Sequence, residues 1–230
     1  MRFRILLSAL AVCAAAVPAG AQTIEATRFA APAAAQAGGG SRPGLRVYGL
    51  YDYVSLAARD SFDAIFDSSN ISGLGVGVEG IDLWRGFFAR FAYTRMTKTG
   101  GTRAFVINGQ VIPTGVGLEV EMSPIEFGGG WRQSLDGIDR YVVYGGVSGL
   151  RMAYKEISEF AQSGDEVDET FNGLAVFAGL DAMVARSVFL GAEVQYRRVP
   201  DAIGFDGVSQ AFGEDDLGGV VFRVLFGIRR

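Results

Sequence analysis

The sequence predicts an all-β fold, an eight-stranded antiparallel up-and-down transmembrane β-barrel, and three observations lead to this fold class. Residues 45–230 divide into eight segments in which apolar residues alternate with small or polar ones. The connections between these segments alternate between short and long. The chain also begins with the pattern of a secretion signal. A strand that turns one side to acyl chains and the other to a polar lumen produces this period of two.

The amino terminus predicts the compartment. A positively charged start is followed by an uncharged apolar stretch from Ile5 to Val17, and Ala19-Gly20-Ala21 is a suitable cleavage site. We therefore predict a signal peptide at residues 1–21, because the apolar stretch is too short for a comfortable membrane-spanning helix. Cys13 lies inside the apolar stretch, and we interpret it as part of the signal and not as a lipoprotein cysteine.

The mature chain has a restricted chemistry. Residues 22–44 are rich in Ala, Gly and Pro and predict a flexible periplasmic segment. Cleavage leaves neither Cys nor His, which excludes disulfides and metal ligation by thiolate or imidazole. Loss of Arg2 and Arg4 turns 21 basic residues into 19, against 25 acidic ones. An acidic chain of this kind is a poor partner for nucleic acid.

Each predicted strand is long enough to cross a bilayer, which takes roughly 9–11 residues when the strand is tilted. In most of them the apolar residues occupy one face and the charged or glycine residues occupy the other. The eight predicted strands are Leu45–Leu56, Ser72–Ile81, Gly86–Thr97, Gly117–Arg132, Tyr141–Ile157, Phe171–Val184, Val188–Arg197 and Leu217–Ile228.

The fourth predicted strand changes phase. We predict that Leu118, Val120 and Met122 face outward and that the alternation slips by one residue at Ser123-Pro124. A proline cannot donate to the ladder, so the slip predicts a β-bulge there. The inward face of the fifth strand stays open at this point.

The connections predict the topology. An even number of strands places both ends of the barrel on the periplasmic side, where a secreted chain arrives. Within the second long connection, Asn108-Gly109 between two apolar runs predicts a hairpin that extends beyond the membrane. The short connections are 82–85, 134–140 and 185–187, and the long ones are 57–71, 98–116, 158–170 and 198–216.

A soluble β-sandwich is the alternative fold. Its strands are shorter, typically about 5–6 residues. Aromatic residues also gather at the segment ends, as they do at the two membrane interfaces. We predict Trp84, Trp131 and Tyr141 at the short-turn side and Tyr53, Tyr93, Tyr154 and Tyr196 toward the long loops.

The predicted lumen collects charges of both signs. Eight strands enclose a space that side chains can just fill, and isolated buried charges are costly. We predict an internal ion-pair network around Arg90, Glu126, Glu193 and Arg223, which would fill the barrel; a narrow polar pore is the other interpretation. The inward candidates are Arg46, Asp52, Glu79, Arg90, Glu126, Arg132, Asp181, Glu193, Arg197 and Arg223.

The strand patterns resemble the small outer-membrane β-barrel family that includes the OmpA transmembrane domain and the opacity-type, porin-like proteins. The resemblance implies a cell outer-membrane location in a Gram-negative envelope and insertion by the outer-membrane assembly machinery. That machinery commonly recognises a last strand that ends in an aromatic residue, whereas this chain continues from Phe226 to Arg230. The segments that carry the resemblance are SPIEFGGGWRQ (123–133), VVYGGVSGLRMAY (142–154), FLGAEVQYRRVPDAIG (189–204) and FGEDDLGGVVFRVLFGIRR (212–230).

The residues predict no enzyme, because histidine, the usual general base, is absent. A serine activated by Lys98 or Lys155, or a carboxylate pair, are the chemistries that remain. We predict no catalytic, cofactor-binding or metal residues and no cofactor. Two acidic runs are interpreted as solvated loop surface, with divalent-cation binding as the alternative: Asp165, Glu166, Asp168 and Glu169, and Glu214, Asp215 and Asp216.

Two function classes follow. The first is a non-enzymatic envelope protein that stabilises the outer membrane or presents its long loops to a surface partner, as an adhesin does. The second is a small pore or solute-binding transport barrel. The expected partners are outer-membrane lipid, lipopolysaccharide and the assembly machinery.

Overall fold

The computed structural model describes residues 43–107, 110–158, 167–204 and 207–230. The predicted signal peptide and residues 22–42 lie outside them. The barrel unit is one antiparallel sheet in which each strand pairs with its sequence neighbours and β8 closes on β1, so the predicted architecture is confirmed. The strands are β1 (Gly44–Leu56), β2 (Asn70–Trp84), β3 (Phe87–Ile107), β4 (Gln110–Ser134), β5 (Tyr141–Ser158), β6 (Val167–Met183), β7 (Val188–Arg198) and β8 (Gly219–Arg229).

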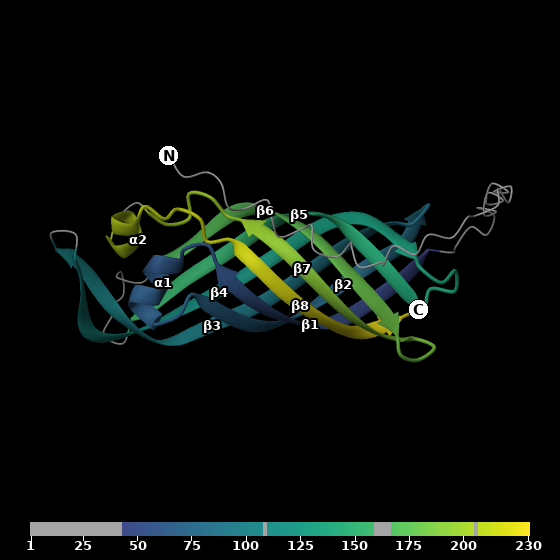
Figure 1. The fold of residues 1–230 in the computed structure, drawn as a ribbon, viewed down its shortest axis with the longest axis horizontal. Helices are drawn as coiled ribbons and strands as arrows, with labels where there is room; N and C mark the ends of the chain where they lie inside the picture. Colours follow the sequence, from purple (N-terminus) through teal and green to yellow (C-terminus); the bar gives the residue numbers. More distant parts are fainter. Residues whose placement is uncertain (1–42, 108–109, 159–166, 205–206) are drawn as a thin grey trace, which may run out of the picture. The chain divides into compact units, whose positions relative to one another are not determined.

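The barrel has a loop end and a turn end (Figure 1). The short connections after β2, β4 and β6 lie at the turn end. Leu45 and Arg230 exchange two backbone hydrogen bonds there, of 3.0 and 2.9 Å, so both ends of the barrel sequence meet at the turn end.

Two short helices at the loop end were not predicted. They are α1 (Arg59–Phe66), between β1 and β2, and α2 (Gly207–Phe212), between β7 and β8. Both contact β3 and each other. None of the helices in the described part of the chain is long and apolar enough to cross a membrane.

The outer surface of the strands is apolar and the inner surface is mixed. On β7, Leu190, Val194 and Tyr196 are about half exposed, while Glu193 and Arg197 are buried. The other strands with a clear predicted phase, apart from β4, follow the same rule. Exposed apolar side chains arranged around a closed sheet suit lipid and not water, so the barrel is a transmembrane one.

The predicted phase of β4 is wrong. Leu118, Val120 and Met122 are buried inside the barrel, no more than 8 % exposed. The pairing with β3 keeps one register on both sides of Pro124, since Tyr93 lies opposite Ile125 and Met96 lies opposite Met122. No bulge therefore occurs at Ser123-Pro124. The apolar residues on the loop side of Pro124 and the polar residues on its turn side share the inward face. The interior of the barrel changes from apolar near the loop end to polar toward the turn end.

Register shifts occur elsewhere. One lies between Gly80 and Trp84 of β2, next to Asp82, which adopts a positive φ of 55°. Two more lie in β3, between Lys98 and Gly101 and between Thr102 and Ala104. The first lies next to the turn after β2, and the other two lie in the half of β3 nearer the loop end.

The hairpin formed by β3 and β4 extends beyond the other strands, as predicted. Phe105 pairs with Ile112 and Ile107 with Gln110. The predicted turn residues Asn108 and Gly109 lie outside the described residues.

The aromatic side chains at the segment ends mostly face outward, as predicted. Trp84 and Trp131 make an edge-to-face contact at the turn end, with ring centroids 6.5 Å apart. Tyr154 lies toward the long loops, as predicted, but it is only 5 % exposed and faces inward, so it is not part of the outward aromatic girdle. It belongs to the even-numbered inward face of β5, whose phase the sequence left open.

Candidate functional site

The inward residues of β1 cross the lumen layer by layer. From the turn end they are Arg46, Tyr48, Leu50, Asp52, Val54 and Leu56, and all six are buried. Four layers follow in this order: a charged layer at Arg46, an aromatic and apolar layer at Tyr48 and Leu50, a charged layer at Asp52, and an apolar layer at Val54 and Leu56. The candidate functional region is therefore the filled lumen and the cavity at its loop end.

Arg223 is the centre of the charged layer nearer the loop end. Its Nε and Nη2 atoms donate to the two carboxylate oxygens of Asp52 at 2.6 and 2.9 Å. The same guanidinium donates to Glu126 at 2.7 and 3.2 Å, and Nη1 lies 3.5 Å from Glu193. A planar fork of donors suits such paired contacts. We call this layer the central network; its residues are Asp52, Arg90, Thr94, Glu126, Glu193, Gln195, Arg197 and Arg223.

Two further arginines complete the central network. Arg197 donates to Asp52 at 2.8 Å and to Glu126 at 2.6 Å. Arg90 donates to Glu193 at 2.6 Å and to Glu126 at 3.3 Å. Three arginines thus face three carboxylates, and the charges balance.

The sequence predicted this layer only in part. All ten inward candidates are buried, and the contacts of Arg90, Glu126, Glu193 and Arg223 confirm the predicted network. The central positions of Asp52 and Arg197 were missed, as were the amide of Gln195 and the hydroxyl of Thr94, which donates to Asp52 at 3.3 Å. Strand alternation indicates which side a residue faces but not which residues share a level.

A second charged layer lies toward the turn end. Arg46 forms ion pairs with Glu79 at 3.1 Å and with Asp181 at 2.8 Å. Its guanidinium carbon also lies 3.7 Å from the centroid of the Phe189 ring. An aromatic layer lies between these ion pairs of Arg46 and the central network. In this layer Phe88, Tyr144 and Phe177 contact one another at centroid distances of 6.0 to 6.4 Å.

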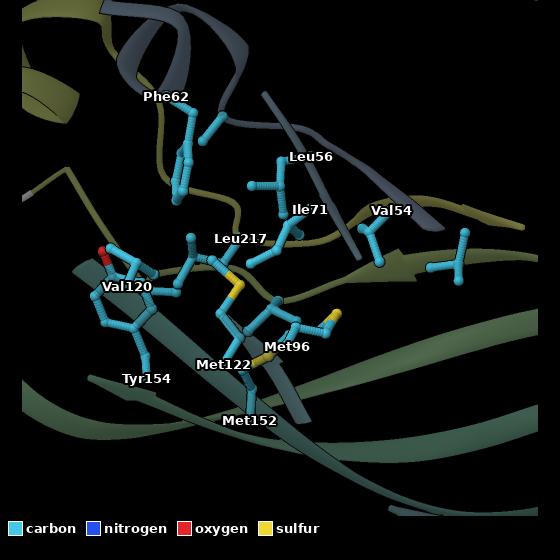
Figure 2. Close-up of a cluster of buried hydrophobic side chains, with 14 of the residues drawn as sticks. Val54, Leu56, Phe62, Ile71, Met96, Val120, Met122, Met152, Tyr154 and Leu217 are labelled. Atoms are coloured by element: carbon cyan, nitrogen blue, oxygen red, sulfur yellow. The ribbon is translucent and has the colours of Figure 1, made fainter. Parts of the chain in front are cut away.

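The loop half of the lumen is filled by apolar side chains (Figure 2). Met96, Met122 and Met152 lie together there, and unbranched methionine side chains fill irregular spaces well. None of the residues in this apolar cluster is more than 5 % exposed, so the cluster closes the barrel on the loop side of the central network. We call it the apolar plug; its residues are Val54, Leu56, Ala58, Phe62, Ile71, Met96, Val120, Met122, Leu150, Met152, Tyr154, Val199, Ala202, Leu217 and Val221.

No protein-family model matches the sequence, and no curated protein matches it. Among solved structures, the outer-membrane protein OprG from Pseudomonas aeruginosa is similar with a TM-score of 0.50 and 11 % identity, over 84 % of this chain and 98 % of OprG. The chain has the fold of the small eight-stranded outer-membrane β-barrels. Ail from Yersinia pestis, solved in complex with the heparin analogue sucrose octasulfate, is also similar, with a TM-score of 0.49 and 13 % identity over 83 % of this chain and 100 % of Ail.

The barrel carries a cavity of about 590 Å³ at its loop end. Its floor includes Phe62, Val120 and Tyr154 of the apolar plug, and α1 and α2 form one side. Tyr154 donates a hydrogen bond to Glu156. We call this cavity the loop-end pocket.

The acidic run before β8 is structural and not free surface. Glu214 accepts hydrogen bonds from the backbone N–H groups of Asp60 and Ser61, both at 2.9 Å, and from the Ser61 hydroxyl. Helix α1 begins after Ala58, whose side chain cannot cap it. A carboxylate 153 residues away in sequence therefore caps this helix, and only the folded structure reveals it.

The same run also holds the loop before β8. Asp216 accepts hydrogen bonds from the N–H groups of Val199 and Gly218, both at 2.7 Å. The described ranges contain no group of three or more acidic side chains placed to hold a metal ion. The divalent-cation hypothesis thus has no assembled site in the run 214–216. In the other run, Asp165 and Glu166 lie outside the described residues.

The other residues singled out by their chemistry are dispersed. Lys98 donates to the backbone carbonyl of Asn70 at 2.7 Å. Lys155 lies opposite Asp168 in the ladder between β5 and β6. Glu169 lines the loop-end pocket. Three glycines that the sequence analysis did not single out, Gly128-Gly129-Gly130, lie within β4, where an added Cβ at Gly128 or Gly130 would meet the backbone of β5.

Proposed function

We propose that this chain is a non-enzymatic protein of the Gram-negative cell outer membrane, exported by a signal peptide cleaved near Ala21. Its role is envelope-structural or surface-contacting: the barrel anchors it in lipid and lipopolysaccharide, and the loop end, α1 and α2 form the contact surface. The outer-membrane assembly machinery inserts it. The single observation that carries the proposal is the lumen, which is filled at four successive levels between Arg46 and Leu56.

The apolar outer surface supports the membrane part of the proposal. On β2 and β6, Leu74 and Leu174 are each 70 % exposed, and on β8, Phe226 is 61 % exposed. Transfer of this apolar surface from water into lipid lowers the free energy. The neighbouring strands leave no open sheet edge, as a bilayer requires.

The orientation is tested by surface labelling. The predicted mature chain has no cysteine, so a single introduced cysteine reports one position. We expect a membrane-impermeant maleimide to label Thr99→Cys at the loop end on intact cells. The matched variant Ser187→Cys, in a turn after β6, should be labelled only after cell disruption. Labelling of Ser187→Cys on intact cells would overturn the proposed orientation.

Transport is the second candidate, and the loop-end pocket is the observation that favours it. A pocket for a solute that continued into a pore would let small sugars enter proteoliposomes. Liposome swelling with arabinose and with sucrose separates the two functions. Swelling no faster than in protein-free liposomes supports the contact function, whereas faster swelling supports transport.

A further inference from the structure

The loop-end pocket has the size and the lining of a small-molecule site. Its volume of about 590 Å³ lies within the range of about 300–1,000 Å³ that is typical of ligand pockets. It opens to solvent, because exposed side chains such as Arg103 and Phe105 lie on its rim. Its floor is closed by the apolar plug, so a molecule that enters from outside stops there.

Most of the lining is apolar and much of it is aromatic. Phe62 and Phe66 of α1 stack with ring centroids 5.7 Å apart. Phe171 of β6 and Leu118 of β4 contribute from the barrel wall. Binding of an apolar group to surfaces of this kind is favourable, because it removes apolar area from water.

Both carboxylates of the pocket lie on the wall formed by β5 and β6, together with Tyr154, whereas the polar residues Ser61, Arg103 and Ser209 line it from other elements. Tyr154 and Glu169 are directly opposite each other in the ladder between β5 and β6, and Glu156 lies two residues further along the inward face of β5. Diagonal neighbours of this kind lie roughly 7–8 Å apart. Two carboxylates thus share this wall, while the cation Arg103 comes from β3. A carboxylate wall favours a ligand with a hydrogen-bond donor or a positive charge and disfavours an anion.

We propose that the loop-end pocket binds a small amphipathic amine, whose apolar body contacts Phe62, Phe66 and Phe171 and whose ammonium group is held by Glu156 and Glu169. Tyr154 positions Glu156 through its hydrogen bond to Oε1. This site goes beyond the proposed contact function and does not depend on it.

The test uses the full mature chain in lipid nanodiscs, followed by NMR during titration with hexylamine, hexanol and hexanoate. We expect hexylamine to cause saturable shifts of the amides of Val120, Tyr154 and Phe171, with those of Val76 and Val194 on the lipid-facing side unchanged. Hexanol should bind more weakly, and hexanoate at least about tenfold more weakly than hexylamine. Equal affinity for hexanoate, or shifts that do not saturate, would overturn the proposal.

Two matched pairs of variants connect binding to the pocket. Glu156→Gln should weaken hexylamine binding about tenfold and leave hexanol binding nearly unchanged. Glu119→Gln, on the outward face of the same end of β4, should change neither. Ala104→Leu should weaken all pocket binding by filling space, whereas Ala153→Leu on the outer surface should not. Unchanged hexylamine binding in both Glu156→Gln and Ala104→Leu, with the barrel folded, contradicts the site.

Discussion

Arginine carries the positive charge in both charged layers of the lumen. Arg46, Arg90, Arg197 and Arg223 each contact two or more carboxylates. A guanidinium stays charged when buried and offers several donors in one plane, so one side chain can bridge opposite walls of a narrow barrel. Lysine would supply a single point charge there.

Which residues are buried could be predicted from the sequence, and which residues meet could not. A period of two determines the side of the sheet, so all ten charged candidates were found. The height of each side chain along the barrel axis depends on strand tilt and on the register of the closed sheet. Closure of the sheet brings Asp52 next to Arg223, which is 171 positions away in sequence. Local sequence carries no signal of that kind.

We expect Arg223→Met to be strongly destabilising. The substitution leaves Asp52 and Glu126 buried with fewer partners, and breaking one side of a buried pair typically costs about 3–5 kcal/mol. Urea unfolding in lipid vesicles, followed by the fluorescence of Trp84 and Trp131, measures this loss.

The matched control is Arg95→Met. Arg95 pairs with Glu121 at 2.7 Å on the outer surface, where its side chain is 62 % exposed. Exposed pairs contribute little to stability, so this variant should unfold at nearly the same urea concentration as the native chain. A native-like midpoint for Arg223→Met would show that the central network is dispensable.

At the scale of elements, β4 shows where strand prediction works and where it fails. Its existence and its length through the membrane follow from alternation. Its phase does not, because Val120 and Met122 face an apolar interior whereas Glu126 faces a polar one. The rule that polar residues face the lumen holds for the turn half of this barrel and reverses at the apolar plug.

Helix α1 shows a second limit. Its capping group comes from the loop before β8, so the helix depends on the closure of the whole barrel. An anionic group at a helix amino terminus also interacts favourably with the helix dipole. The acidic run at 214–216 was interpreted as solvated surface because no local pattern connects it to residues 60–61.

We expect Glu214→Gln to loosen α1 without unfolding the barrel. The amide side chain accepts weaker hydrogen bonds and carries no charge, so the amides of Asp60 and Ser61 should exchange with deuterium about tenfold faster. Hydrogen exchange read by NMR in nanodiscs measures this. Asp215→Asn is the control, since Asp215 makes none of these contacts. Equal exchange rates in the native chain and in Glu214→Gln would rule out the capping role.

At the scale of the whole molecule, the two faces of the closed sheet have different roles. Its outer face meets lipid, and its inner face builds a core from side chains that β1 to β8 contribute in turn. Because the ten buried charged candidates are five arginines and five carboxylates and the other levels are mostly aromatic or apolar, side chains fill the interior as they fill a protein core.

We expect charge on the lipid-facing surface to be costly only within the membrane. Val194 lies midway along β7 between Ala178 and Phe222, and an arginine there should cost about 2–4 kcal/mol in vesicles. Ile112→Arg, on the hairpin beyond the membrane, should change the unfolding free energy little. The two variants are compared by urea unfolding in the same vesicles. An equally small effect at Val194 would contradict the membrane-spanning assignment.

The most direct test of the filled lumen is the conductance of the purified, folded protein in a planar lipid bilayer. The apolar plug and the central network predict that the membrane current stays at the level of the protein-free bilayer, without stable steps. Arg223→Met, which opens the central network and leaves the apolar plug intact, should also stay silent. Large, stable conductance steps from the native chain would contradict the account.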